Sequence, residues 1–248
     1  MLDMHIDPRQ PFRASDAIAA GLVTPKVLRG PRFRRLFTGI YVRSDVEVTP
    51  EVRARAAHLL LDGHGALGGF SAAELLGASC GPLDAPAEIV VPRGHVTPRP
   101  GLLVRLDELA PDEITEAGGC EVTSALRTAY DLARRLPLVE AVVALDALAF
   151  AQKFEPAGVL LLARRHVGSR GSARLPEIVP LATRLAESPM ETRIRMALHF
   201  AGLRPPVLQH PVGPYLLDMA YPELMVAVEY DGRDHLTPER ALRDLERA

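Results

Sequence analysis

The chain has 248 residues, a length that suits one large domain or two ordinary ones. Apolar residues make up 48% and charged residues 24%, so the composition is that of a globular protein and excludes a disordered chain. The longest apolar run, residues 138–151, is interrupted by two acids, and the N-terminal ten residues contain no apolar core. We therefore expect no membrane span and no secretory signal, and a cytoplasmic location.

The net charge of −2 is unevenly distributed. Residues 1–55 contain ten Lys or Arg and six Asp or Glu, whereas residues 56–186 and residues 187–248 each contain three more acids than bases. The basic surplus lies in an acid-free stretch with six cationic side chains: Lys26, Arg29, Arg32, Arg34, Arg35 and Arg43. Such a stretch is typical of a surface that contacts nucleic-acid phosphates.

The first segment, residues 1–50, predicts two short helices followed by a β-hairpin. Residues 14–20 are helical and end at Gly21, and Thr24 with Pro25 is an N-cap followed by proline at the first helical position. Residues 32–37 and 40–42 form the hairpin. This order indicates a winged-helix-like segment in which the six cations bind DNA. The alternative is a basic, solvated hairpin that packs on the next domain.

The second segment, residues 51–186, predicts a mixed α/β domain. Helices are expected over residues 51–61 and 71–76, with a Gly-rich turn between them. Two strands, residues 88–91 and 102–105, are expected to form a hairpin through a Pro/Gly-rich turn. Residues 123–152 are helical in pattern, with a break at Pro137, and further helices follow.

The third segment, residues 187–248, predicts a helix followed by a three-stranded meander. Ser188 is an N-cap, followed by proline at N1 and Glu191 at N3, where an acid forms a capping box. The strands are expected at residues 207–212, 215–221 and 225–230, and a polar helix begins at Pro238.

Two acids of this meander are expected to lie opposite one another. If Glu223 and Leu224 form a two-residue turn, paired positions sum to 447, and Asp218 pairs with Glu229. Like charges in directly opposed positions destabilise a sheet, and a divalent cation bound by carboxylate oxygens would offset the repulsion. Two separately solvated acids are the alternative, because a slip of one residue would place them on opposite faces.

Three further groups belong to the same region. Asp231 lies two residues after Glu229 and so shares its face if the strand extends that far. His235 follows in a Gly-containing turn, where an imidazole can act as a general acid or base. Glu191 is on the preceding helix, and its role as the N3 acid of the capping box is sufficient to explain it.

The run from Asp218 through Glu229, Asp231 and Gly232 to His235, with Arg243 and Asp244, resembles the very-short-patch-repair-like endonucleases. These are domains of the PD-(D/E)XK, restriction-endonuclease-like group, found in many actinobacterial proteins. Residues 188–195 and the Ala-Gly-Leu-Arg-Pro-Pro run after them are similar to the segment that precedes the motif. Upstream, residues 14–43, 71–77 and 123–132 resemble proteins with an AbiEi-like antitoxin N-terminal half.

The resemblance implies a site for Mg²⁺ or Mn²⁺. In it Asp218, Glu229 and the backbone carbonyl of Tyr230 would hold the metal, and Asp231 would take the position of the signature lysine. The same resemblance makes His235 a group that helps to activate water, and Glu191 an additional helical acid. The implied reaction is metal-assisted attack of water on a phosphodiester.

The expected fold class is α+β, with a winged-helix-like N-terminus, a mixed middle domain and an incomplete endonuclease-like C-terminus. The family continues with a further strand and helix, so the resemblance implies a truncated domain, either active or degenerate. The alternative function is non-enzymatic: an AbiEi-like antitoxin or transcriptional regulator that binds DNA and a cognate toxin. Neither function involves a membrane.

Overall fold

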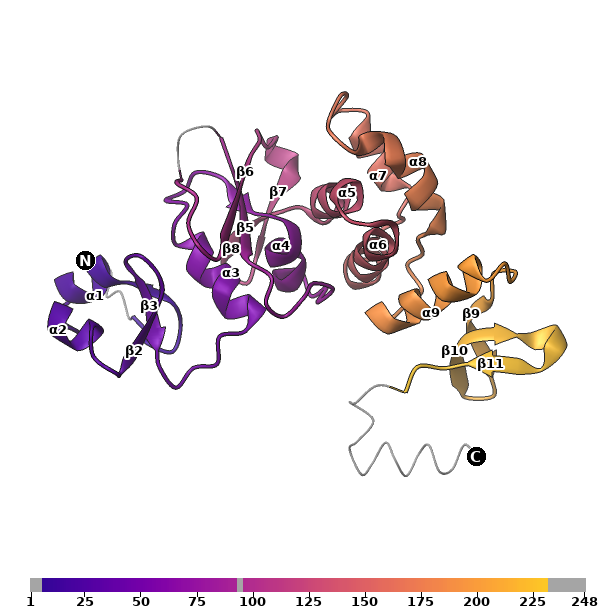
Figure 1. Cartoon of the computed structure of the whole chain (residues 1–248), viewed down its shortest axis with the longest axis horizontal. Helices are drawn as coiled ribbons and strands as arrows, with labels where there is room; N and C mark the ends of the chain where they lie inside the picture. Colours follow the sequence, from indigo (N-terminus) through magenta and orange to yellow (C-terminus); the bar gives the residue numbers. More distant parts are fainter. Residues whose placement is uncertain (1–5, 93–95, 232–248) are drawn as a thin grey trace. The chain divides into compact units, whose positions relative to one another are not determined.

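The computed structural model describes residues 6–92 and 96–231. It is an α+β protein whose chain divides into two compact units, residues 1–184 and residues 185–248 (Figure 1). Each unit is described by itself. In the described parts of the chain, no helix has the length and apolar character needed to cross a bilayer.

The first unit begins with a small sheet and two short helices. Its elements are β1 (Phe12–Arg13), α1 (Ala14–Ala19), α2 (Pro25–Leu28), β2 (Phe33–Phe37) and β3 (Ile40–Arg43). The hydroxyl of Thr24 caps α2 by accepting a hydrogen bond from the N–H of Val27, as the Thr-Pro pair predicts. The sheet order is β1-β3-β2, with β3 antiparallel to both neighbours. The expected helices and hairpin are therefore present.

A mixed five-stranded sheet forms the centre of the first unit (Figure 1). Its strands are β4 (Ala66–Leu67), β5 (Ala87–Val91), β6 (Leu102–Leu106), β7 (Ile114–Ala117) and β8 (Cys120–Thr123). The order is β6-β5-β4-β8-β7, and β4, β5 and β8 are buried in the middle. Three of these strands, β4, β7 and β8, were not expected from the sequence. β4 has only two residues, and β7 and β8 form a hairpin that turns at Gly118 and Gly119.

The expected hairpin between residues 88–91 and 102–105 is wrong. The two strands are present but run parallel, with Ala87 opposite Leu102 and Val91 opposite Leu106. A tight turn cannot join parallel neighbours, because the chain must first return to the starting edge of the sheet. The connection between Val91 and Leu102 is therefore a return crossing rather than a hairpin turn.

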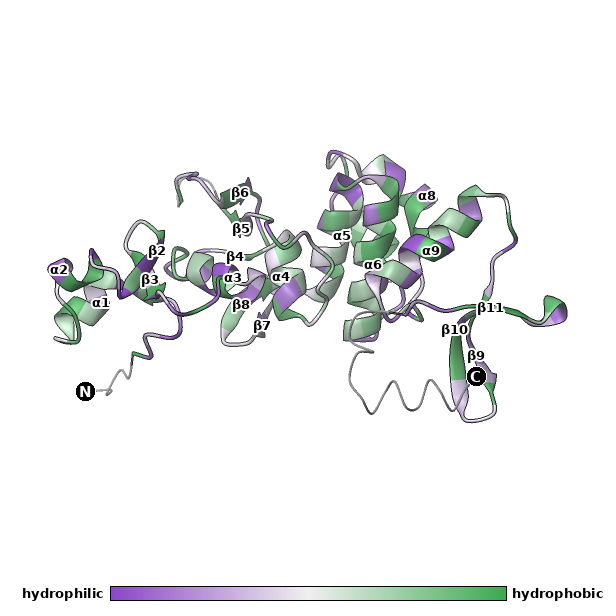
Figure 2. Ribbon diagram, turned by 60° about the horizontal axis from the view of Figure 1, so that its bottom comes forward, coloured by the Kyte–Doolittle hydropathy of each residue, from purple (hydrophilic) through white to green (hydrophobic). Residues whose placement is uncertain are grey.

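Six further helices in the described part of the chain belong to the same unit. They are α3 (Pro50–His58), α4 (Gly69–Leu75), α5 (Ala125–Arg135), α6 (Leu138–Gln152), α7 (Gly158–Ala163) and α8 (Leu175–Ile178). Of these, α3 and α4 contact the strands of the sheet, and α5 to α8 pack mainly on one another. The break at Pro137 separates α5 from α6, as the sequence predicts, and these two helices lie side by side (Figure 1). In Figure 2 α6 is coloured hydrophobic along most of its length, in keeping with its eight buried residues.

The second unit consists of one helix and a three-stranded antiparallel sheet. Its elements are α9 (Pro189–Phe200), β9 (Val207–Val212), β10 (Tyr215–Tyr221) and β11 (Val226–Val228). The sheet order is β11-β10-β9, the meander that the sequence predicts. Met196 of α9 and Met219 and Ala220 of β10 are buried. The polar helix expected after Pro238 lies outside the described residues.

Candidate functional site

The start of α9 fixes the position of Glu191. The hydroxyl of Ser188 accepts a hydrogen bond of 3.2 Å from the N–H of Glu191, which is the expected N-cap. The carboxylate of Glu191 accepts a hydrogen bond of 3.0 Å from the N–H of Glu187, one residue before the N-cap. Glu191 is thereby held with only 8% of its surface exposed, unlike the solvated acid of an ordinary capping box.

The β10–β11 hairpin has the register that the sequence predicts. Met219 lies opposite Val228 and Tyr221 opposite Val226, so paired positions sum to 447. The tip differs from the expected two-residue turn: residues 222–224 form a 3-10 turn, and Met225 follows with φ of +54°. The ladder ends at Val228, so Asp218 and Glu229 would form the next pair. Beyond the ladder, the N–H of Tyr230 donates a hydrogen bond of 3.0 Å to Oδ2 of Asp218.

Asp218 and Glu191 interact although they come from different elements. Burial raises the pKa of Glu191, and the negative charge of Asp218 raises it further. Hydrogen bonds from the N–H of Glu187 and at Ser188 act in the opposite direction without cancelling these effects. The helix and the hairpin thus place two carboxylates where the ionised form of one is disfavoured by the other.

The remaining predicted site residues lie beyond the last residue of β11 or outside the described part of the chain. Glu229 and Asp231 are exposed at the end of the described chain, beyond the last residue of β11. His235 lies outside the described residues. The N–H of Tyr230 contacts Asp218, and the metal-ligand role that the resemblance implies for its carbonyl stays a prediction. The residues brought together are therefore Asp218, Glu191 and Tyr230.

Carboxylate oxygens are the ligands that hard divalent cations such as Mg²⁺ prefer. Within residues 6–92 and 96–231, no group of three or more His, Cys, Asp or Glu side chains could hold a metal ion. Two carboxylates suffice for Mg²⁺ when water and substrate phosphate oxygens complete its octahedron. Asp218 and Glu191 are the two carboxylates of this region that could each offer an oxygen to such an ion, and they fall short of a three-ligand protein site.

The six N-terminal cations do not share one environment. Lys26, Arg29, Arg32, Arg34 and Arg35 are exposed. Arg43 is half-buried and forms a bidentate ion pair with Asp45, at 3.0 and 2.6 Å. Since that pairing neutralises its charge, Arg43 is the least suited of the six to hold a phosphate.

A buried charge cluster around Arg127 was not expected from the sequence. Arg127 lies on α5 with a fully buried side chain, and it forms ion pairs with three acids: Asp107, Glu113 and Asp131. His166 is bonded to Glu113 at 2.6 Å. Burial works to raise the pKa of Glu113, but hydrogen bonds from His166 and Arg127 outweigh it and leave the pKa lowered. In the sequence, only the i,i+4 spacing of Arg127 and Asp131 signals the cluster.

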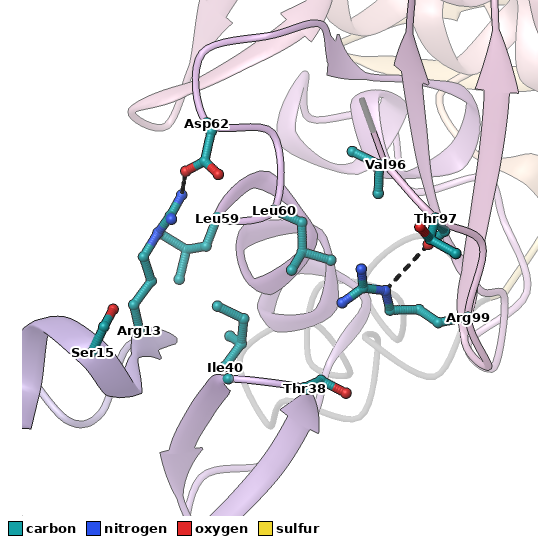
Figure 3. Close-up of a pocket in the computed structure, with 11 residues that line it drawn as sticks. Arg13, Ser15, Thr38, Ile40, Leu59, Leu60, Asp62, Val96, Thr97 and Arg99 are labelled. Carbon is teal, nitrogen blue, oxygen red and sulfur yellow. Dashed lines mark hydrogen bonds and ion pairs between the residues drawn. The ribbon is translucent and has the colours of Figure 1, made fainter. Parts of the chain in front are cut away.

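A polar cavity of about 390 Å³ lies between the turn of the N-terminal hairpin, the end of α3 and the β5–β6 connection (Figure 3). Arg13 pairs with Asp62 on one side of it, and Arg99 points into it from the β5–β6 connection (Figure 3). Ile40 and Leu60 supply an apolar wall. Because the pairing neutralises Arg13 and Asp62, the cavity retains a single cation among its described lining residues, and these form no catalytic arrangement.

No family model matches the sequence. The chain is similar to two uncharacterized proteins of Mycobacterium tuberculosis, one from strain CDC 1551 / Oshkosh and one from strain ATCC 25618 / H37Rv. Each is 26% identical over 216 residues, which cover 85% of this chain and 78% of the relative. The matched length exceeds that of either compact unit, so the similarity includes residues of both units.

Proposed function

We propose that the protein is a metal-dependent enzyme that hydrolyses phosphodiester bonds of DNA through Asp218 and Glu191. The observation that carries the proposal is that the negative charge of Asp218, on β10, helps to raise the pKa of the largely buried Glu191, on α9. Two acids that repel one another in a partly buried place reduce the stability of the fold, and perturbed groups of this kind are common at functional sites. A bound cation would remove the repulsion.

The chain's own residues would orient the site. The N–H of Tyr230 holds Oδ2 of Asp218, and the N–H of Glu187 holds one oxygen of Glu191, so both carboxylates are positioned before any ion arrives. A bound Mg²⁺ or Mn²⁺ would supply stabilisation of the charge that develops on the phosphate. We propose three additional groups from the residues that follow β11 in the sequence: Glu229, Asp231 and His235. Of these, His235 is the proposed proton-transfer residue.

Cleavage of plasmid DNA tests this function. The full chain is expected to nick or linearise the plasmid in Mg²⁺ or Mn²⁺ and not in EDTA. Asp218→Asn preserves the size of the side chain and a hydrogen-bond acceptor but removes the charge, so it should abolish cleavage. Glu223→Gln, an exposed acid at the tip of the same hairpin, is the control and should cleave at the wild-type rate. Cleavage that survives in Asp218→Asn would rule out this active site.

A second candidate function is DNA binding without catalysis, as in an AbiEi-like regulator that also binds a toxin. The observation that favours it is the exposure of Lys26, Arg32, Arg34 and Arg35, for which the described residues provide no ion-pair partner. Arginine side chains that are not neutralised within the protein are available for phosphate oxygens. The two functions are compatible, because the cations and the carboxylates belong to different units.

A further inference from the structure

We propose that the loop between α7 and α8 is a second surface for DNA phosphates. We define the basic loop as residues 164–174. The inference rests on the proposed function, since it adds a binding surface for the same substrate. It concerns residues that neither the N-terminal cations nor the carboxylate site includes.

The basic loop has a strong local excess of positive charge. The chain contains no Asp or Glu between Glu155 and Glu177, and in that interval it has four arginines and one histidine. Arg164, Arg170 and Arg174 are exposed. This acid-free interval resembles the N-terminal residues 26–43 in its content of cations, so the first unit carries two such stretches.

Two of the arginines keep their charge available. Arg165 is paired bidentately with Asp112, at 2.6 and 2.9 Å, so its charge is neutralised. Arg174 uses one guanidinium nitrogen to bond the carbonyl of Leu136. Among the described residues, neither Arg164 nor Arg170 has an acidic partner. These two side chains are therefore the cations that a ligand would meet.

The backbone of the basic loop is fixed to the end of α5. Arg134 donates a hydrogen bond of 3.1 Å to the carbonyl of Arg170, and the hydroxyls of Tyr130 and Ser172 bond at 2.9 Å. The ring of His166 stacks on that of Tyr130 with centroids 5.3 Å apart. Gly171 has φ of +88°, and a Cβ there would lie 2.1 Å from the carbonyl oxygen of Arg134, so only glycine permits this approach.

A rigid cationic loop suits a phosphate backbone in particular. A phosphate contact that requires no ordering of the loop loses less conformational entropy than one made by a flexible arm. The guanidinium fork matches two phosphate oxygens, and the four permanently charged side chains of the loop are all arginines. We therefore assign the loop to DNA phosphates rather than to an acidic protein surface.

The test is the salt dependence of duplex binding, measured in EDTA by fluorescence anisotropy with a labelled duplex of about two helical turns and the full chain. The slope of log Kd against log salt falls by about 0.9 for each phosphate that the protein no longer neutralises. Arg164→Ala/Arg170→Ala should reduce the slope by nearly twice that amount and raise Kd at every salt concentration. The charge-neutral control Asp112→Ala/Arg165→Ala removes a neighbouring ion pair and should retain the wild-type slope.

An unchanged slope in Arg164→Ala/Arg170→Ala would overturn the proposal, and so would a wild-type chain that does not bind the duplex. Circular dichroism and the melting temperature of each variant establish that a reduced slope does not reflect unfolding. Failure here is distinguishable from failure of the proposed enzyme, because binding of Mn²⁺ to Asp218 and Glu191 can be measured without DNA.

Discussion

At the residue scale, burial separates arginines that look alike in the sequence. Arg127 lies on a helix with an acid four residues later, a pattern that normally indicates an exposed ion pair. Its side chain is instead fully buried among Asp107, Glu113 and Asp131. Burial opposes its charge, but these three acids outweigh burial and leave its pKa raised. The sequence could not reveal this, because two of the acids come from segments that the topology brings to α5.

Replacement of Arg127 by methionine should strongly destabilise the first unit. The substitution preserves most of the volume but removes the buried cation that Glu113 and Asp131 share, and leaves them only the pairing of Asp131 with Arg134 and Arg135 and of Glu113 with His166 and Arg165. Removal of one partner from a buried ion pair costs about 3–5 kcal/mol. Urea unfolding followed by circular dichroism measures the change. Arg164→Met, an exposed control, should alter the free energy of unfolding by less than about 0.5 kcal/mol. Similar unfolding midpoints for the two variants would contradict the assigned role of the cluster.

The stability of the first unit should fall in acid partly because of Glu113. Since the pKa of Glu113 is lowered in the folded state, the unfolded chain binds more protons. Its contribution is therefore fully present above the unfolded-state pKa of about 4.3 and is lost as the pH falls through the lower folded value. Melting temperatures of Glu113→Gln should decline less steeply below about pH 5 than those of the wild type. The exposed control Glu108→Gln should follow the wild type, and parallel curves for all three proteins would refute this assignment.

At the scale of elements, the sequence predicted helix caps correctly, but it predicted the direction of paired strands less well. Ser188 and Thr24 cap the helices that their sequences predict, because a cap depends only on neighbouring backbone groups. The predicted direction of β6 relative to β5 was wrong. A Pro/Gly-rich connection indicates that the chain turns, but it does not show whether one turn or two separate the strands. The register of the β10–β11 hairpin was correct because its tip is short and its strands pair locally.

Substitutions in the β2–β3 hairpin test the proposed N-terminal contact with DNA. Arg34 and Arg35 are adjacent exposed residues of β2, and Arg43 of the paired strand is neutralised by Asp45. Arg34→Ala/Arg35→Ala should weaken duplex binding and reduce the salt slope by about 0.9 for each phosphate that these arginines neutralise. Arg43→Ala is the matched control with a smaller expected effect. If the double variant and the control both bind like the wild type, the hairpin packs on the protein without contacting DNA.

At the scale of the whole molecule, the chemistry is divided between two units. The exposed cations of the N-terminus and of the basic loop belong to the first unit, and the two carboxylates belong to the second. The sequence predicted Asp218 from the register of the strands that carry it. Glu191 was assigned to the site of Asp218 only through the family resemblance, because no local sequence signal relates a residue of α9 to a residue of β10.

The proposed metal site at Asp218 and Glu191 can be tested by calorimetric titration of the full chain with Mn²⁺. We expect a binding event in the wild type that is abolished in Asp218→Asn and weakened in Glu191→Gln, because each variant removes one of the two ligand charges. Glu223→Gln should titrate like the wild type. A wild-type chain that binds no Mn²⁺, or an Asp218→Asn variant that binds it unchanged, would contradict a metal site at these carboxylates.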